Sequence, residues 1–389
     1  MTTLISFLGK GRSDPQTGYQ TTTYRFDDGS TRNVPFFGLA LADHLRAERL
    51  IVVGTRGSMW DVFFERQGAD DGAVLELMAA VEHEQVDETL LELPCRELAG
   101  RLGIPVVGLL IPYARDVAEQ VDILQRLAAV VAPGERLCLD VTHSFRHLPV
   151  LALVAARYLA RVVGVTVEDV YYGAWDMRSP AGETPVLRLG GLLTLLDWVD
   201  ALACYDKDGD YAVFAPLLEA DGLQAARARQ LATAAYYERT NNPVKAREML
   251  TGVFSAIETH RGRLGHLFRE TLKKRIGWFR GPRRDDWERS LADAYYDRHD
   301  YLRAAILLYE AFVTRACNDR RDNPNDFDCR REAYQAASVQ TPVVRQLEHL
   351  RNALAHGVRP RSADDDKVLT DESKLRETLK TLRRELFKP

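Results

Sequence analysis

Short apolar runs alternate with longer amphipathic stretches through the first half of the chain. The runs have the length of strands, and the stretches between them carry apolar residues at helical spacing. An alternation of this kind predicts an α/β Rossmann-like domain in which helices flank a mostly parallel sheet. The five expected strands of this sheet are residues 4–8, 50–54, 106–111, 137–141 and 169–175.

A second strand pattern lies between the first two of these strands. Residues 21–26 and 31–36 have strand-like composition, and Asp27-Asp28-Gly29-Ser30 separates them. Aspartate and glycine between two such segments are typical of a tight turn. The sequence therefore predicts a β-hairpin inserted early in the domain.

The strand pattern gives way to helical spacing after about Leu192. A sequence without strand signals and with apolar residues three and four apart predicts an all-α region. The expected helices include residues 223–237, 244–259 and 302–316, and a charged tail helix over 372–387.

Glycine and proline in Gly281-Pro282-Arg283-Arg284 interrupt the helical pattern and mark a boundary. We therefore expect an α/β domain over residues 1–191, an all-α linker region over 192–284 and a C-terminal all-α domain over 285–389. Ala235-Tyr236-Tyr237-Glu238-Arg239 is echoed by Ala294-Tyr295-Tyr296-Asp297-Arg298. Two copies lack the sustained period of a repeat protein, so ordinary pairing of helices explains them.

The charges are unevenly distributed, although the net charge of the 389-residue chain is only -4. Residues 61–100 contain eleven acidic residues and two arginines, whereas residues 261–289 contain ten lysines and arginines and four acidic residues. A basic segment of this kind is either a solvated helix surface or a contact for nucleic-acid phosphates. Charge alone leaves both interpretations open.

The five cysteines are widely spaced, odd in number and form no Cys-x-x-Cys pair. This pattern argues against a disulfide framework and against a zinc knuckle. The first residues lack the charged start of a signal peptide, and no apolar run reaches the ~18 residues of a membrane span. We expect a soluble, cytoplasmic protein with no membrane partner.

Three loops that follow expected strands carry small, hydroxyl or cationic residues. They are Gly9-Lys10-Gly11, Thr55-Arg56-Gly57-Ser58 and Asp140-Val141-Thr142-His143-Ser144-Phe145-Arg146, the last of which leads into an apolar helix. Open parallel sheets bind ligands at the carboxyl ends of their strands, and the N–H groups of a helix start attract anions. The loops therefore predict a pocket for a nucleotide-like anion, in which Lys10 and Arg56 neutralise charge.

A simpler interpretation of the third loop is that Thr142 or Ser144 caps the helix while His143 and Arg146 are solvated. The chain contains neither a Gly-x-Gly-x-x-Gly pattern nor a Gly-Lys-Ser/Thr pattern. A dinucleotide cofactor and ATP hydrolysis are therefore not expected.

The segment from Glu348 to Gly357 contains Arg-x-x-x-x-His with an asparagine after the arginine. Asn352 and His356 share a helix face, and the long Arg351 side chain can reach the same phosphate. Such a group suits metal-free RNA cleavage, in which the ribose 2'-hydroxyl attacks phosphorus, His356 moves a proton and Arg351 stabilises the phosphate charge. No His-Glu-x-x-His or cysteine-rich set predicts a metal site. The alternative is a structural helix with a surface arginine and histidine.

Both segments resemble motifs of one known family. Arg351-Asn352-Ala353-Leu354-Ala355-His356-Gly357 resembles the signature of HEPN ribonucleases, and residues 140–146 resemble the ligand motif of CARF sensor domains. Ser6-Phe7-Leu8-Gly9-Lys10-Gly11 and Tyr24-Arg25-Phe26 resemble the N-terminal region of CARF-HEPN ribonucleases that accompany type III CRISPR complexes. The resemblance spans most of the chain, and the linking helices match least distinctively.

The resemblance implies a CARF domain over residues 1–191 and a HEPN ribonuclease domain over residues 285–389. It implies a homodimer, or a higher assembly of dimers, that a cyclic oligoadenylate activates to cut single-stranded RNA in antiviral defence. Cyclic tetra-adenylate is favoured as the activator over cyclic hexa-adenylate, and no cofactor or metal is implied.

The resemblance also assigns roles to individual residues. Arg351 and His356 would carry catalysis, with Asn352 assisting. The residues expected in the activator pocket are Gly9, Lys10, Gly11, Thr55, Arg56, Gly57, Ser58, Asp140, Thr142, His143, Ser144 and Arg146.

Two other functions stay open at this point. One is a cyclic oligoadenylate sensor or scaffold whose C-terminal domain dimerises or binds RNA without cutting it. The other is a ring nuclease that degrades the activator, with Thr142, His143 and Lys10 positioning a ribose hydroxyl. A CARF-linked transcription factor ranks last, because the helical middle of the chain lacks the strands of a winged helix.

Overall fold

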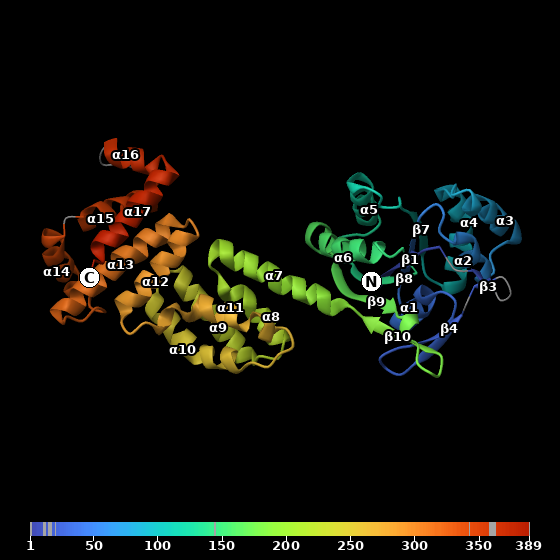
Figure 1. Cartoon of the computed structure of the whole chain (residues 1–389), viewed down its shortest axis with the longest axis horizontal. Coiled ribbons are helices and arrows are strands. Elements are labelled where there is room, and N and C mark those ends of the chain that lie inside the picture. The colour runs from blue at the N-terminus through green and yellow to red at the C-terminus, as the bar shows by residue number, and fades with distance from the viewer. Residues whose placement is uncertain are drawn as a thin grey trace. The chain divides into compact units, whose positions relative to one another are not determined.

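The chain forms two compact units, Met1–Thr194 and Leu195–Pro389. The first unit contains a sheet with helices on both faces, and the second is built from helices in the part of the chain that is described (Figure 1). The computed structural model describes residues 2–10, 13–14, 18–19, 21–143, 145–341, 343–357 and 363–388.

The main sheet of the first unit has eight strands in the order β5-β4-β10-β9-β8-β1-β6-β7. The five strands from β9 to β7 run parallel to one another. A separate two-stranded ribbon joins β2 to β3. The strand bounds are β1 (Thr2–Leu8), β2 (Ser13–Asp14), β3 (Gly18–Tyr19), β4 (Thr22–Arg25), β5 (Thr31–Val34), β6 (Arg49–Gly54), β7 (Val106–Leu110), β8 (Arg136–His143), β9 (Thr166–Gly173) and β10 (Glu183–Arg188).

Both faces of this sheet are buried, which explains the continuous apolar runs of its strands. In β1, Leu4 and Leu8 belong to one apolar cluster, and Ile5 and Phe7 belong to another on the opposite face. The first cluster includes side chains of α1 to α4, and the second includes side chains of α5 and α6. The helix bounds are α1 (Phe37–Leu45), α2 (Trp60–Arg66), α3 (Asp71–Glu82), α4 (Glu88–Leu102), α5 (Val117–Ala129) and α6 (Leu148–Tyr158), with shorter turns η1 (Leu159–Val163) and η2 (Trp175–Met177).

The helices of the second unit begin with α7, whose first residues belong to the first unit. Two apolar clusters fill this unit, one among α7 to η4 and one among α12 to α17, and Trp278 packs against both. The bounds are α7 (Gly190–Asp208), η3 (Tyr211–Phe214), α8 (Ala215–Ala220), α9 (Ala225–Arg239), α10 (Pro243–Thr259), α11 (Gly265–Ile276), η4 (Gly277–Arg280), α12 (Arg284–Asp297), α13 (Tyr301–Arg320), α14 (Phe327–Gln340), α15 (Val343–Ala355), α16 (Ala363–Leu369) and α17 (Glu372–Leu386).

The five parallel strands, the inserted hairpin and the helical second half are confirmed as elements. Strand β10 was not expected. It pairs antiparallel with β9 and parallel with β4, and it thereby joins the hairpin to the main sheet. The division between the linker region and the last domain near residue 284 stays a prediction, since residues 195–389 form one compact unit.

The two Ala-Tyr-Tyr segments pack against each other in the second unit. The Tyr295 hydroxyl on α12 donates a hydrogen bond of 3.0 Å to Glu238 Oε1 on α9. Burial raises the pKa of the Glu238 carboxyl to about 7. A protonated Glu238 therefore suits this packing better than a charged one.

All five cysteines are free, and burial raises the thiol pKa of Cys95 and Cys138 to about 11. Within the described ranges, no helix combines the length and the apolar character needed to cross a membrane.

Glu238→Gln tests the role of the buried carboxyl in stability. A carboxyl pKa that is higher in the folded than in the unfolded state stabilises the fold at low pH, and this contribution is lost as the pH rises through about 7. At pH 8 the variant should be more stable than the wild type by roughly 1–3 kcal/mol, and the difference should vanish only below the ordinary glutamate pKa, at about pH 3.5. Urea unfolding at both pH values measures this. A variant that is less stable at pH 8 would contradict the assignment.

Candidate functional site

The carboxyl ends of the parallel strands form the edge at which the candidate sensor site lies. After β1 the chain adds β6 and β7 on one side of β1, and it then adds β8 and β9 on the other side. The gap between β1 and β8 is therefore the topological switch point, where open α/β sheets bind ligands. The three predicted loops follow β1, β6 and β8, and they meet at this edge.

The carboxylate of Asp140 joins the two strands at the switch point. It is fully buried and accepts hydrogen bonds from Ser6 Oγ (2.7 Å) and from the backbone N–H of Thr142 (2.9 Å). Desolvation raises the pKa of Asp140 to about 6. A Cβ at Gly38, the second residue of α1, would lie 2.1 Å from Ser6 Oγ, so a glycine lets the helix pack this close to the pair. Asp140 thus shapes the strand ends and is covered by protein.

His143 and Thr142 also make contacts inside the protein. His143 Nε2 accepts a hydrogen bond of 3.1 Å from the backbone N–H of Phe37, the first residue of α1. Burial lowers the pKa of His143 to about 4, so its imidazole is neutral near pH 7. Thr142 Oγ1 accepts a hydrogen bond of 2.8 Å from the backbone N–H of Gly173 at the end of β9. Both side chains therefore tie the end of β8 to its neighbours.

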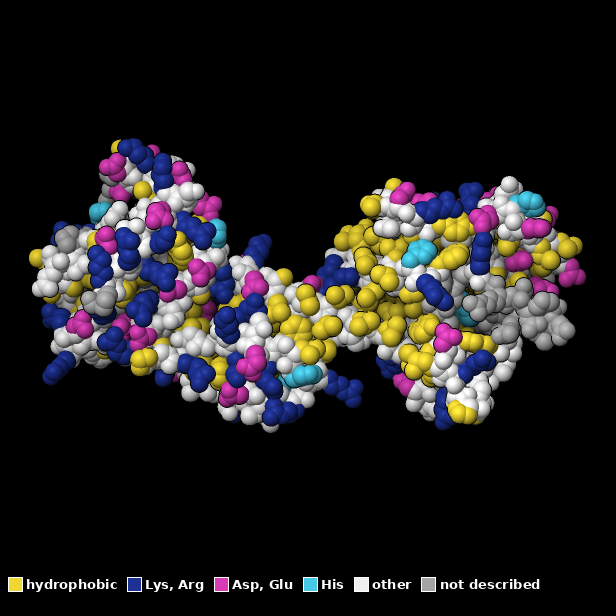
Figure 2. Space-filling view, viewed as in Figure 1, with side chains coloured by type: hydrophobic (Ala, Val, Ile, Leu, Met, Phe, Trp, Pro, Cys, Tyr) yellow, Lys and Arg dark blue, Asp and Glu magenta, His cyan; other side chains and the backbone are white. Residues whose placement is uncertain are grey.

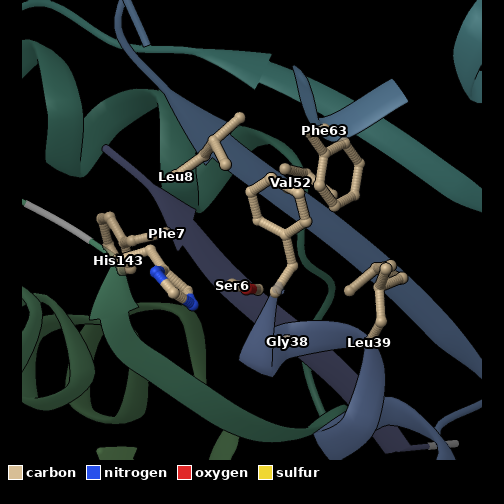
Figure 3. Close-up of a pocket in the computed structure, with 10 residues that line it drawn as sticks. Ser6, Phe7, Leu8, Gly38, Leu39, Val52, Phe63 and His143 are labelled. Atoms are coloured by element: carbon tan, nitrogen blue, oxygen red, sulfur yellow. The ribbon is translucent and has the colours of Figure 1, made fainter. Parts of the chain in front are cut away.

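A small cavity lies between His143 and the start of α1 (Figure 3). Its volume is about 10 Å³, room for about one water molecule. Figure 3 shows His143 at the end of β8 with its ring directed toward the side of the cavity where Ser6 lies. No nucleotide fits this space, so this cavity is not the predicted pocket for a nucleotide-like anion.

The hydroxyls of Thr55 and Ser58 stabilise their own loop. Both side chains are fully buried. Ser58 Oγ donates a hydrogen bond of 2.7 Å to the carbonyl of Leu8 and accepts one of 2.9 Å from the backbone N–H of Thr55. The carbonyl of Gly9 accepts a hydrogen bond of 3.0 Å from the N–H of Met59. This loop is therefore fixed to the end of β1, and Arg56 is exposed beside it.

The residues that face outward at this edge line a pocket of about 410 Å³. This volume falls within the range of small-molecule sites. Arg56 and Glu84 line it, together with Tyr113 and Arg115 from the segment between β7 and α5. Lys10 Nζ lies 2.5 Å from the Glu84 carboxylate. Cations, an aromatic ring and two carboxylates, Glu84 and Glu88, therefore gather at one place.

Tyr113 and Arg115 were not among the predicted site residues. They follow the third parallel strand, and the rule that singled out the other loops also applies to this one. The Arg115 guanidinium lies 4.6 Å from the centre of the Tyr113 ring, and His147 Nε2 lies 2.8 Å from the Tyr113 carbonyl. The predicted Arg146 is exposed, whereas Gly11 and Ser144 lie outside the described residues.

A broad apolar groove of about 830 Å³ adjoins this pocket and lies between α5 and α6. Tyr113 and Arg115 line both the groove and the pocket. Figure 2 shows apolar side chains gathered over this part of the first unit. Four valines of the two helices are largely exposed, namely Val117 (73%), Val121 (46%), Val150 (69%) and Val154 (52%).

In the second unit, the Arg-x-x-x-x-His motif lies at the end of α15. Arg351 and Asn352 belong to its last turns, and His356 follows the last helical residue. The backbone N–H of His356 still donates a hydrogen bond of 3.0 Å to the carbonyl of Asn352. Gly357 adopts a left-handed conformation (φ 76°), which ends the helix and leaves the His356 side chain exposed.

One tyrosine ring stacks against Arg351, and a second tyrosine packs against the first. Its guanidinium lies 4.1 Å from the centre of the Tyr309 ring of α13, and its Nη2 donates a hydrogen bond of 2.8 Å to Asn352 Oδ1. The ring centres of Tyr309 and Tyr334 are 5.4 Å apart, and the Tyr334 hydroxyl donates to Glu348 on α15. Arg351 is therefore held on one face by an aromatic ring and along one edge by an amide oxygen.

In the described portion of the chain, no group of three or more histidine, cysteine, aspartate or glutamate side chains is arranged to hold a metal ion. The motif at the end of α15 consists of an arginine, an amide and an imidazole. These groups can bind a phosphate and move a proton.

Comparisons with known proteins agree with the architecture of the first unit. The family model "CRISPR system endoribonuclease Csx1, CARF domain" matches residues 3–175. CRISPR-associated protein MJ1674 of Methanocaldococcus jannaschii is 24% identical over 404 aligned residues, which cover 93% of this chain and 63% of that protein. The chain thus spans less than two thirds of the length of this relative. With its parallel sheet and the match over residues 3–175, the first unit is a CARF domain, and the chain is similar to CRISPR-associated proteins that contain one.

Proposed function

We propose that this protein is a metal-independent endoribonuclease of type III CRISPR defence, which a cyclic oligoadenylate activates to cut single-stranded RNA. The observation that carries the proposal is the pairing of two sites in one chain. A cationic pocket lies at the ligand edge of the CARF domain, and a supported Arg351 lies close along the chain to an exposed His356 in the helical unit. The helices from α12 onward would form the HEPN domain.

The pocket suits an activator that carries several phosphates. Lys10, Arg56 and Arg115 provide charge, and Tyr113 provides an aromatic ring against which an adenine can stack. Thr55, Ser58, Asp140, Thr142 and His143 would act indirectly, because their side chains are hydrogen-bonded within the protein at the strand ends. Cyclic tetra-adenylate is the activator we favour, and cyclic hexa-adenylate is the second candidate.

The apolar groove between α5 and α6 suits a second copy of this chain. Four largely exposed valines on two adjacent helices make an apolar patch of the kind that associates with a partner. A two-fold contact uses the same patch on both copies. Because Tyr113 and Arg115 line both groove and pocket, such a dimer would bring two pockets together beneath one symmetric ring-shaped activator.

The chemistry at α15 would proceed without a cofactor. Arg351 would bind the scissile phosphate and stabilise the charge that develops on its oxygens. His356 would move a proton as the ribose 2'-hydroxyl attacks phosphorus and the 5'-oxygen leaves, giving a 2',3'-cyclic phosphate. Asn352 would hold the edge of the Arg351 guanidinium, as its 2.8 Å contact indicates.

His356→Ala and Arg351→Ala test this mechanism. With cyclic tetra-adenylate and EDTA present, the wild type should cut single-stranded RNA to products ending in a 2',3'-cyclic phosphate, and each variant should be at least about 100-fold slower. Fluorescent RNA cleavage and mass spectrometry of the products measure this. His349→Ala, on the same helix outside the motif, should stay within about twofold of the wild type. Tight RNA binding without cleavage by the wild type would favour the scaffold function.

Tyr309 should position Arg351 through its ring. Tyr309→Phe keeps the ring and should retain activity, whereas Tyr309→Leu should lower kcat about three- to tenfold with KM nearly unchanged. Phe387→Leu is the control, since Phe387 lies 5.8 Å from Arg315, an arginine outside the motif. Equal activity of Tyr309→Phe and Tyr309→Leu would show that the ring at position 309 does not position Arg351.

Val150→Asp tests the dimer surface. A carboxylate buried against the second copy should weaken the dimer at least about tenfold, because burial of an unpaired charge is costly. Sedimentation velocity over a range of concentrations measures the dissociation. Val339→Asp on α14 changes a valine of similar exposure (71%) and should leave the dimer intact. Unchanged sedimentation of Val150→Asp would show that the groove between α5 and α6 is not the dimer interface.

A further inference from the structure

The pocket proposed for the activator is lined by a carboxylate, Glu84, that already pairs with the neighbouring Lys10. Glu84 Oε1 lies 2.5 Å from Lys10 Nζ, and Glu84 lines the same 410 Å³ pocket as Arg56, Tyr113 and Arg115. A side chain at Gly57 would lie 2.8 Å from the Tyr113 hydroxyl and 3.0 Å from Glu84 Cγ. The Glu84 side chain therefore lies directly over the Thr55–Ser58 loop, between residues expected to bind phosphate.

The backbone at Glu84 is unusual for a glutamate. Residue 84 follows the last turn of α3, where its N–H bonds to the Val81 carbonyl (3.1 Å) and the N–H of Gln85 bonds to the Ala80 carbonyl (2.8 Å). This is the Schellman arrangement, in which a left-handed residue, most often glycine, ends the helix. Glu84 adopts that conformation with φ 54°. The position is strained for a residue with a Cβ, and this points to a use for the side chain.

The ion pair is placed where a ligand can exchange with it. The side chains of Lys10 and Glu84 are 50% and 43% exposed, and exposed ion pairs are weak. The hydrogen bond and charge of Lys10, together with the nearby Tyr113 hydroxyl, lower the pKa of Glu84, so the carboxylate is charged near pH 7. A phosphate group offers Lys10 more acceptor oxygens than this carboxylate does.

We propose that Glu84 tunes the affinity of the activator pocket, because its carboxylate holds Lys10 until a phosphate of the activator displaces it. This inference rests on the proposed function, since it concerns the same pocket. A ligand without phosphate offers Lys10 no group that replaces the Glu84 carboxylate. A ligand with phosphate must first break the Lys10–Glu84 ion pair, and this cost lowers its affinity. Glu84 thus sets the activator concentration at which the pocket fills.

Glu84→Gln tests the inference in the full-length chain. The amide keeps the size of the side chain and removes its charge, so Lys10 becomes available to the ligand. The variant should bind cyclic tetra-adenylate about fivefold more tightly than the wild type, measured by isothermal titration calorimetry. Adenosine should bind neither protein. Glu82→Gln is the matched control, because it removes the same charge from the last turn of α3, outside the residues that line the pocket.

A Lys10→Met background separates displacement from simple charge repulsion. If Glu84 acts through Lys10, Glu84→Gln should bring no gain in affinity when Lys10 is replaced. An equal gain in both backgrounds, or no gain in the wild-type background, would overturn the inference while leaving activator binding intact. If neither wild type nor Glu84→Gln binds cyclic tetra-adenylate or cyclic hexa-adenylate, the proposed function fails and this inference fails with it.

Discussion

The hydrogen bond from Ser6 to the buried Asp140 carboxylate fixes the two strands on which the sensor edge depends. It joins β1 to β8 at the switch point, and Asp140 also accepts the N–H of Thr142 to set the direction in which the chain leaves β8. Gly38 lets α1 begin against this pair, and the N–H of Phe37 then orients His143. The loops that carry cations outward therefore start from a rigid base, so that a ligand meets a preformed surface.

In the helical unit, neighbouring side chains likewise position a charged group, the guanidinium of Arg351. Arg351 is exposed enough to meet a phosphate, while Tyr309 and Asn352 contact its guanidinium directly. The ring of Tyr334 packs in turn against Tyr309. An arginine stacked on a ring presents its remaining N–H groups in one plane, which suits a phosphate. In both units, buried or stacked residues position the cations, and the cations would contact the ligand or the RNA.

Much of the fold could be predicted because strands that are buried on both faces have a continuous apolar sequence, as in residues 4–8 and 50–54. Strand β10 was not predicted because its sequence is polar and partly exposed. Its place in the sheet depends on pairing with β4, more than 150 residues earlier in the chain. The motif residues Arg351, Asn352 and His356 were recognisable from their spacing. The support from Tyr309 was not, because it comes from another helix.

In the sensor loops, the sequence did not predict which side chains face the protein interior and which face outward. Residue types at the strand ends indicated an anion site, but they do not tell which hydroxyls turn inward. Thr55 and Ser58 form the loop itself, and His143 is neutral and faces α1. The side chains that face outward are those of Lys10, Arg56, Tyr113 and Arg115. Tyr113 and Arg115 follow β7, whose loop was not among the predicted site loops.

We propose that occupancy of the CARF pocket controls RNA cleavage at α15. To measure this control, the full-length protein is titrated with cyclic tetra-adenylate in EDTA, while activator binding and the cleavage rate of a fluorescent single-stranded RNA are recorded on the same samples. The cleavage rate should rise from a low baseline in parallel with occupancy and reach half its maximum at the same activator concentration. Saturable binding without any change in the cleavage rate would contradict it.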